Sequence, residues 1–464
     1  MSFSVALNVV NVWQDSFCQS QHTHMALTHD PLSFIHALAY DDLPKKVQDQ
    51  TILNVLDLVG VGIGGTQTKL SQIICNHAES QFEGRHRMLF DGRRASATGA
   101  ALALGMTIDA LDGHDGFNPA KGHIGCGVFA GAVAIAQETG LADGREFLAT
   151  IAMGYELGGR LALALHGTVP DYHTSGAWVT VAVAAIGARL LKLDPEQTRH
   201  ALGIAEYHGP RSQMMRDIDF PTMVKDGSGW GAMAGVSAAL LARDGFTGAP
   251  AITLEQAPEY WADIGQRWIS LEQYYKPYPV CRWAQAPIEG VLELRRTHGL
   301  ASKDVERIEV ETFHESVRLA TNEPKNTEEA QYSTSFPCAV AMAKGTVGPA
   351  DIADDALTDP ELMRLSKSLR MIEDESANAV FPAKRLARVR LVLRDGRTLQ
   401  GEWMTPRWDA EAPPTPDELR EKFHSITDPL IGESAAGNIE ASLYGLPDLG
   451  LRPLLELLSQ PMRR

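Results

Sequence analysis

The residues with the greatest chemical variety lie between Asp109 and Gly125. This stretch carries three acids, two histidines and a lysine on a loop interrupted by glycine and proline and flanked by apolar runs. Packing gives no reason for so mixed a set, whereas binding and catalytic residues are often carried by loops. Imidazole titrates near neutral pH, so His123 is a candidate general base, with Asp112 fixing its orientation or tautomer. The alternative is structural, with the aspartates capping helices and turns.

Two further polar segments each open an apolar helix. Residues 172–175 place His173 beside two hydroxyl side chains, and we expect this histidine to bind a carboxylate or carry a proton. Residues 223–231 place Lys225 in a glycine-rich run before a helix of small residues, where backbone N–H groups would favour an anion beside the lysine. An N-cap in the first segment and a solvated lysine in the second are the structural alternatives.

A fourth segment, residues 276–282, contains Lys276, Tyr278 and Arg282. It lies where the helical pattern gives way to a stretch rich in proline and tyrosine. Ligand sites are frequent at domain junctions, so Lys276 is a candidate catalytic cation. Tyr278 and Arg282, together with His114 of the first loop, are candidate substrate-binding residues. The alternative is that Lys276 and Arg282 form ordinary ion pairs between domains.

Several common catalytic motifs are absent from the sequence. The glycine-rich run at residues 60–65 follows a segment of helical character, so we interpret it as a helix end with close backbone contact and not as a dinucleotide-binding loop. No Walker A loop, GxSxG elbow or HExxH pair is present. These absences argue against the nucleotide-binding, serine-hydrolase and zincin classes that such motifs identify.

The polar segments interrupt a series of predicted helices. From about residue 30 to residue 249, apolar residues recur at three- and four-residue spacing, and alanine and glycine are abundant. Small side chains let helix axes approach closely, so this region predicts an all-helical core. The clearest predicted helices cover residues 96–111, 125–139, 145–165, 175–191 and 230–244.

From about residue 271 the pattern changes to mixed α and β. Alternating side chains predict strands over residues 305–311 and 386–393, and Asp395-Gly396 predicts a hairpin turn into a strand over residues 398–403. The run from Thr415 to Glu418 is a capping-box start for helices that return to the first domain. The expected fold is mainly α, with an all-helical domain of residues 1–270 and 406–464 and a smaller α+β lid domain of residues 271–405.

Composition narrows the class of partner. The chain has 464 residues and a formal net charge of -16, which repels nucleic acid and anionic membrane surfaces. Its apolar runs are too short to cross a bilayer. Five scattered cysteines without a CxxC spacing favour a reducing compartment. We therefore expect a cytoplasmic protein that acts on small molecules.

Taken together, the four polar segments resemble the MmgE/PrpD family, which includes 2-methylcitrate dehydratase, cis-aconitate decarboxylase and iminodisuccinate epimerase. Their order along the chain, with the sequence GYELGGRLA at residues 154–162 and KPYPVCR at residues 276–282, carries the resemblance over nearly the whole chain. The resemblance implies a homodimer whose protomers have a large helical domain and a smaller α+β lid. It places the active site between the two, without a required metal or organic cofactor.

The resemblance also implies which residues are functional. The family's D-F-D-D loop matches residues 112–115, and its following histidine matches His123. The histidine that opens a helix matches His173, and the two lysines resemble Lys225 and Lys276.

This sequence departs from the family pattern at several polar positions. The centre of the D-F-D-D loop is Gly113-His114, and the small hydroxyl residue after the loop is Gly116. A histidine often found three places after the first lysine is replaced by Ser228, and a tyrosine of the decarboxylase branch falls at Phe336.

The shared chemistry that the resemblance implies is removal of a proton from carbon next to a carboxylate of a small di- or tricarboxylate. With several family polar groups missing, we favour an epimerase resembling iminodisuccinate epimerase, with Lys225 or Lys276 as the second acid. A dehydratase or decarboxylase is the alternative within the family. Outside that chemistry, two functions compete with it: a metal-dependent hydrolase using His114, Asp115 and His123, and a non-catalytic dicarboxylate-binding protein.

Overall fold

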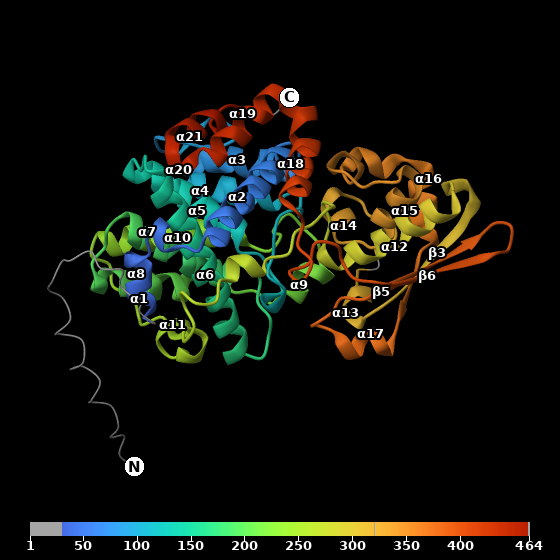
Figure 1. Ribbon diagram of the computed structural model, residues 1–464, viewed down its shortest axis with the longest axis horizontal. Helices are drawn as coiled ribbons and strands as arrows, with labels where there is room; N and C mark the ends of the chain where they lie inside the picture. Colours follow the sequence, from blue (N-terminus) through green and yellow to red (C-terminus); the bar gives the residue numbers. More distant parts are fainter. Residues whose placement is uncertain (1–29, 320, 463–464) are drawn as a thin grey trace, which may run out of the picture.

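The computed structural model describes residues 30–319 and 321–462 and has two parts of different secondary structure (Figure 1). The larger part is a body of packed helices, and the smaller part is built on a four-stranded sheet with helices beside it. This arrangement confirms the predicted fold class. The larger part contains α1 (Pro31–Ala37), α2 (Lys45–Gly65), α3 (Lys69–Gln81), α4 (Ala97–Asp109), α5 (Gly125–Thr139), α6 (Gly144–Thr168), α7 (Gly176–Leu190), α8 (Pro195–His208), α9 (Met215–Asp219), α10 (Ser228–Arg243) and α11 (Ile252–Glu255).

Small side chains allow the buried helices of the larger part to pack closely. A Cβ atom on Gly127 of α5 would lie 2.2 Å from Cγ1 of Val179 in α7, and one on Gly131 would lie 2.4 Å from Cγ1 of Val183. A larger side chain at either position would force the two helices apart. The abundance of glycine in this region is therefore a packing requirement.

The glycine-rich run at residues 60–65 forms the last turns of α2. A Cβ atom on Gly65 would lie 2.0 Å from the carbonyl oxygen of Thr107 in α4. The run lets two helices approach at their backbones, and the prediction of a helix end with close contact is confirmed.

The sheet of the smaller part has the strand order β4-β3-β5-β6. β3 (Val305–Thr312) pairs antiparallel with β5 (Ala387–Leu393), which continues through the predicted hairpin into β6 (Thr398–Met404). β4 (Arg370–Glu373) pairs parallel with β3 at the sheet edge, and the sequence does not predict it because its side chains are mostly exposed and do not alternate. The helices of this part are α12 (Arg282–His298), α13 (His314–Val317), α14 (Thr327–Gln331), α15 (Ser335–Lys344), α16 (Pro360–Ser368) and α17 (Glu375–Val380).

The C-terminal helices return to the larger part, where they cover one face of the helical body (Figure 1). Thr415 and Glu418 form the reciprocal capping box expected at the start of the first of these helices. Its Leu419 and Phe423 join the hydrophobic core of the larger part, whereas residues such as Val310 form a separate core in the smaller part. The returning helices are α18 (Pro416–Ile431), α19 (Glu433–Tyr444), α20 (Leu446–Leu449) and α21 (Arg452–Leu458).

One element of the larger part departs from the all-helical expectation. β1 (His86–Arg87) and β2 (Arg94–Ala95) form a short antiparallel pair between α3 and α4. Of the five cysteines, Cys18 lies outside the described residues, and the other four are buried free thiols. Within residues 30–319 and 321–462, no helix combines the length and apolar character needed to cross a membrane.

Candidate active site

The loop between α4 and α5 is held in place by the returning C-terminal segment. Asp112 turns the chain in the left-handed conformation, with φ at 50°, a region that aspartate enters more readily than most residues. Lys422 of α18 donates a hydrogen bond to the carbonyl oxygen of Gly113 (2.6 Å) and forms an ion pair with Asp57 of α2 (2.5 Å). A segment some 300 positions later in the chain therefore fixes the start of the loop.

Asp112 forms a buried ion pair with Lys276. The lysine Nζ lies 2.6 Å from Oδ1 and 2.8 Å from the carbonyl oxygen of the same aspartate. Burial alone would lower the pKa of Lys276, but the carboxylate of Asp112 raises it above its usual value. The pair joins two predicted segments and keeps the ammonium group charged.

His123 lies beside this pair with its tautomer fixed. Its Nδ1 is 2.6 Å from the carbonyl oxygen of Asp115, which can only accept a hydrogen bond, so Nδ1 carries the proton and Nε2 keeps its lone pair. The main-chain N–H of His123 donates to Oγ of Ser175 (2.7 Å). Burial, followed by the nearby charges of Lys276 and His114, lowers the pKa of His123 well below its usual value. The imidazole is therefore neutral at pH 7 and can accept a proton at Nε2.

Asp112 does not fix the tautomer of His123, contrary to the sequence prediction. Its Oδ1 is 3.8 Å from Nε2, beyond hydrogen-bond distance, because the carboxylate is bound by Lys276. The carbonyl of Asp115 fixes the tautomer instead. At 3.8 Å the carboxylate still favours a positive charge on the imidazole after proton transfer.

His114 is enclosed within the loop and is not placed to bind a substrate as predicted. Its Nδ1 is 3.1 Å from the carbonyl oxygen of Asp115, and its Nε2 is 3.3 Å from Oδ1 of Asp109. Burial lowers its pKa, but Cys126 and Asp109 outweigh this and raise it well above its usual value. The His114 ring lies edge-on to the His123 ring, 4.4 Å between centroids, and so supports it from within the protein.

Lys225 reaches the first loop through a glutamine of the smaller part. It also has a left-handed backbone, with φ at 53°. Its Nζ donates to Oε1 of Gln331 at the end of α14, and Nε2 of Gln331 donates to the carbonyl oxygen of Ala110 (3.0 Å). The charge of Lys225 is among those that lower the pKa of His123. The amide of Gln331 thus bridges the two parts of the molecule.

Arg282 and Arg385 bring two more buried cations to the junction. The guanidinium of Arg282 lies 4.1 Å from the centre of the Tyr274 ring and 3.1 Å from Oδ2 of Asp409. Burial raises the pKa of Tyr274 to about 12, although the charges of Lys276, Arg282 and Arg385 oppose this. Among the described residues, the buried Nε atoms of both arginines have no hydrogen-bond partner. These N–H groups are donors available to an anion.

The segment around His173 contacts the site through Ser175 and not through the histidine. The Nδ1 of His173 bonds to the carbonyl oxygen of Asp171 (3.0 Å), and its ring stacks with His166 at 6.4 Å. Ser175 accepts from the main chain of His123 and donates to Asp226, the residue after Lys225. The structure therefore brings Asp112, His123, Lys225, Lys276 and Arg282 together and places His173 to one side.

Tyr278 is directed away from this group. Its hydroxyl donates to Oε1 of Glu289 (2.9 Å), and its ring belongs to the core of the smaller part. The prediction that Tyr278 binds substrate does not fit this geometry, because the backbone after Lys276 turns the side chain into the smaller part.

The arrangement of His114, Asp115 and His123 does not match the metal-site alternative. The Nδ1 atoms of both histidines are directed at the same carbonyl oxygen of Asp115. The Asp115 carboxylate is instead bound by the hydroxyl of Tyr155 (2.7 Å). Across residues 30–319 and 321–462, no group of three or more histidine, cysteine, aspartate or glutamate residues is arranged to hold a metal ion.

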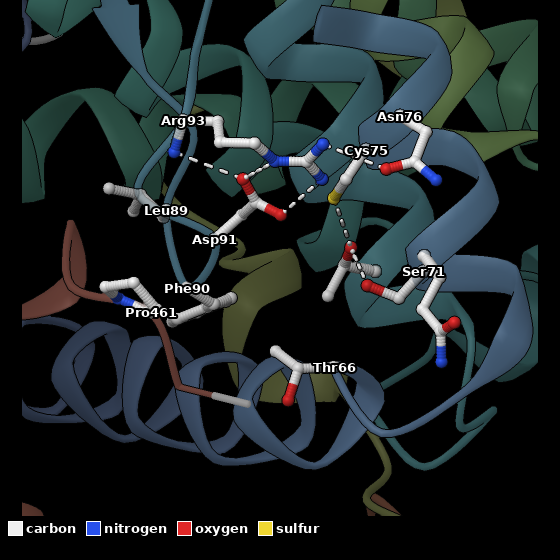
Figure 2. Close-up of a pocket in the computed structure, with 11 residues that line it drawn as sticks. Thr66, Ser71, Cys75, Asn76, Leu89, Phe90, Asp91, Arg93 and Pro461 are labelled. Atoms are coloured by element: carbon white, nitrogen blue, oxygen red, sulfur yellow. Dashed lines mark hydrogen bonds and ion pairs between the residues drawn. The ribbon is translucent and has the colours of Figure 1, made fainter. Parts of the chain in front are cut away.

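Among the cavities formed by the described residues, two outside this cluster are of interest. One, of about 240 Å³, lies in the larger part, and Figure 2 shows Arg93 paired with Asp91 there (2.7 Å). Arg93 also pairs with Glu79 (2.5 Å), so its charge is already balanced. The other, of about 450 Å³, lies at the junction and is lined by both parts, including Met214 and Trp283. Both of these residues belong to a hydrophobic cluster that extends to Tyr332, one residue after Gln331.

Sequence reasoning missed the residues that the smaller part contributes. Tyr274 lies two positions before Lys276, and this proximity was the one signal in the sequence. The sequence gives no such signal for the other three residues, because the polar stretches that contain them match no motif: Gln331, Tyr332 and Arg385. These residues lie at the site because the smaller part packs against the larger one.

Comparison with known proteins agrees with this architecture. The N-terminal domain of the MmgE/PrpD family matches residues 32–261, and its C-terminal domain matches residues 278–443. The chain is also similar to a cis-aconitate decarboxylase-like protein of Aspergillus oryzae, with 22% identity over 480 residues that cover 93% of this chain and 97% of the relative. Since the two family domains account for most of its length, the chain belongs to the MmgE/PrpD family.

Proposed function

We propose that the protein is an enzyme that abstracts a proton from carbon next to a carboxylate of a small di- or tricarboxylate. The observation that carries this proposal is a set of four buried cations, Lys225, Lys276, Arg282 and Arg385, near a neutral His123. Buried charge is costly unless it is compensated. Lys225 and Arg385 are bound only by neutral oxygen atoms within the described residues, so a polycarboxylate would supply the missing negative charge.

In this mechanism Nε2 of His123 takes the proton from carbon. The electron pair left behind delocalises into the adjacent carboxylate. The ammonium and guanidinium groups stabilise the added negative charge on that carboxylate. Such interactions are stronger in a site that excludes water than in solution. Asp112 stabilises the imidazolium that forms, since its carboxylate lies 3.8 Å from Nε2.

For the step that follows, we favour epimerisation of a small polycarboxylate such as iminodisuccinate. Epimerisation needs only reprotonation from the other face, whereas a lyase must protonate a departing hydroxide or expel carbon dioxide. The absence of several family polar groups supports this choice, and Phe336, at the position of the decarboxylase tyrosine, is packed in the core of the smaller part. The cis-aconitate decarboxylase-like relative favours the second candidate, a lyase.

Incubation of the protein with a panel of small di- and tricarboxylates in heavy water tests the function. An epimerase will incorporate deuterium at the α-carbon of both stereoisomers, whereas a lyase will accumulate an unsaturated product. The matched control is His123→Asn, which keeps a polar side chain but removes the base. If no substrate of either class shows exchange or turnover, the non-catalytic binding alternative replaces the enzyme.

We also propose that the protein acts as a homodimer. Four large apolar side chains are exposed between α8 and the start of α10: Tyr207 (79%), Phe220 (72%), Val224 (65%) and Trp230 (42%). Exposed apolar groups in one region are typical of an interface, and a second copy is the partner that the family resemblance implies. Light scattering is expected to give twice the mass of the chain, and Tyr207→Glu is expected to weaken association. A monomer at micromolar concentration would contradict the proposal.

A further inference from the structure

A tyrosine and an aspartate at the junction have no role in the mechanism above. Tyr332 is buried and follows α14 of the smaller part, whereas Asp217 lies on α9 of the larger part. The Tyr332 hydroxyl and the Asp217 carboxyl are close enough that each shifts the pKa of the other. The Nζ of Lys225 lies 5.0 Å from the centre of the Tyr332 ring. The pair therefore lies beside a cation of the proposed site.

The short helix α9 is held against the smaller part on two sides of Asp217. Ile218 packs in one hydrophobic cluster with Trp283 and Tyr332. Asp219 forms an ion pair with Arg318, which follows α13. These contacts cross from the larger part to the smaller one and fix the position of the Asp217 carboxyl relative to the Tyr332 hydroxyl.

We propose that Tyr332 is the second acid of the site, donating its phenolic proton to the substrate carbanion, and that Asp217 is the residue that positions and reprotonates it. This inference rests on the proposed function. His123 belongs to the larger part and Tyr332 to the smaller part, so the proposed step places a substrate between one group from each part. The two groups would then act on opposite faces of the same carbon.

The proton balance of this step is complete. The substrate C–H bond breaks as Nε2 of His123 takes the proton, and the electron pair stays on the substrate. The O–H bond of Tyr332 then breaks as a new C–H bond forms, and the resulting tyrosinate takes a proton from the Asp217 carboxyl. His123 finally releases one proton to solvent and Asp217 takes one up, so no net proton is consumed.

The other candidate donors are less well placed for this step. Lys276 is tied to Asp112 by a 2.6 Å ion pair, and Lys225 donates to Gln331. Phe336 has no hydroxyl and is fully enclosed in the smaller core, near the start of α15. Tyr332 is therefore the donor that we assign to this step, since its ring lies beside Lys225.

The charges around Asp217 allow it to carry a proton at neutral pH. Burial raises the pKa of Asp217 to about 7; Lys225 and Tyr332 oppose this, while Asp109 and Asp112 add to it. Because the acid form is the one required, the reaction should slow as the pH rises above about 7. The pKa of Tyr332 is raised well above its usual value, mainly by burial, so the phenol stays protonated until the carbanion forms.

The test compares Tyr332→Phe with Tyr278→Phe, which also removes one tyrosine hydroxyl from the smaller part. We expect Tyr332→Phe to exchange the α-hydrogen of its substrate with heavy water but to lose inversion by roughly 100-fold, while Tyr278→Phe keeps both. Inversion at the wild-type rate in Tyr332→Phe would overturn the inference alone. Absence of exchange in the wild-type protein would overturn the proposed function and the inference with it.

A second comparison keeps the inference testable if Tyr332→Phe does not fold. Asp217→Asn should lower kcat with little change in KM and should remove the fall in rate above about pH 7. Asp244→Asn, at the exposed C-cap of α10, should leave the pH profile unchanged. If Asp217→Asn keeps the wild-type profile and kcat, Asp217 has only a structural role and the inference is wrong.

Discussion

Lys225 and Lys276 are both buried in the candidate site, yet their surroundings differ. Lys276 forms a 2.6 Å ion pair with Asp112, so its charge is balanced by a carboxylate of the loop between α4 and α5. Lys225 donates instead to the neutral amide of Gln331, which comes from the smaller part. A balanced ion pair holds two segments together. A cation that is hydrogen-bonded only to a neutral group retains an uncompensated positive charge, which can attract an anionic ligand. The first lysine thus serves mainly the structure of the site and the second mainly its chemistry.

Removing the balanced lysine should have the largest effect. Lys276→Met leaves the Asp112 carboxylate buried without its partner, which we expect to lower the free energy of unfolding by roughly 3–5 kcal/mol. Urea denaturation measures the change. The double variant Lys276→Met/Asp112→Asn should recover part of the loss, because no buried charge is then left unpaired. A loss below about 1 kcal/mol in the single variant would mean that the two lysines do not differ in this way.

Removing the lysine on the neutral partner should affect catalysis more than stability. We expect Lys225→Met to lower kcat/KM by roughly 10²–10³-fold, because one cation facing the developing charge is lost. Its free energy of unfolding should change less than that of Lys276→Met. The control is Lys192→Met, since Lys192 also has a positive φ, of 56°, but is exposed. Full activity in Lys225→Met would remove Lys225 from the mechanism.

Giving Lys225 a carboxylate partner should make it resemble Lys276. In Gln331→Glu the new carboxylate competes with the substrate for the ammonium group. We expect KM to rise about tenfold, equivalent to about 1.4 kcal/mol of binding free energy. Steady-state kinetics measures this, with Gln331→Asn as the uncharged comparison. An unchanged KM would show that the substrate does not use the charge of Lys225.

The smallest expected effect is the pH dependence of stability that follows from the lowered pKa of His123, to which burial contributes most and the two lysines add. Burial and the nearby charges hold the pKa of folded His123 below 6.5, so the unfolded chain binds a proton first as the pH falls. Stability should therefore fall below pH 6.5, by less than about 1 kcal/mol from this residue between pH 6.5 and pH 6. Denaturation midpoints of the wild type and His123→Asn should diverge over this range. Parallel curves would mean that the pKa of His123 is not lowered.

Local features of the fold were predictable from the sequence because their causes are local. The helix predicted over residues 125–139 is reproduced residue for residue as α5, and the Thr415 capping box starts α18. Polar residues that interrupted apolar helices also identified Asp112, His123, Lys225 and Lys276 as one potential site. Helix periodicity and capping depend on neighbours a few positions apart, and these are visible in the sequence.

The roles of individual side chains were less predictable. His114 and Tyr278 were chosen for their chemistry, but His114 is enclosed by Asp109 and Asp115, and Tyr278 turns into the smaller core. A polar residue near a site faces the ligand or supports a neighbour depending on backbone direction. The sequence does not record that direction for an irregular loop.

By itself, the sequence determined the helices, the main strands, the negative net charge and the segments that carry the acids, histidines and lysines. Only the tertiary structure decided the pairings, joining Lys276 to Asp112 across 164 positions and Lys225 to Gln331 across 106. It also brought Tyr332 to Asp217 from different parts of the molecule. The physical reason is that a buried charge must find a partner in space, and that partner depends on how whole helices pack and not on neighbours in the chain.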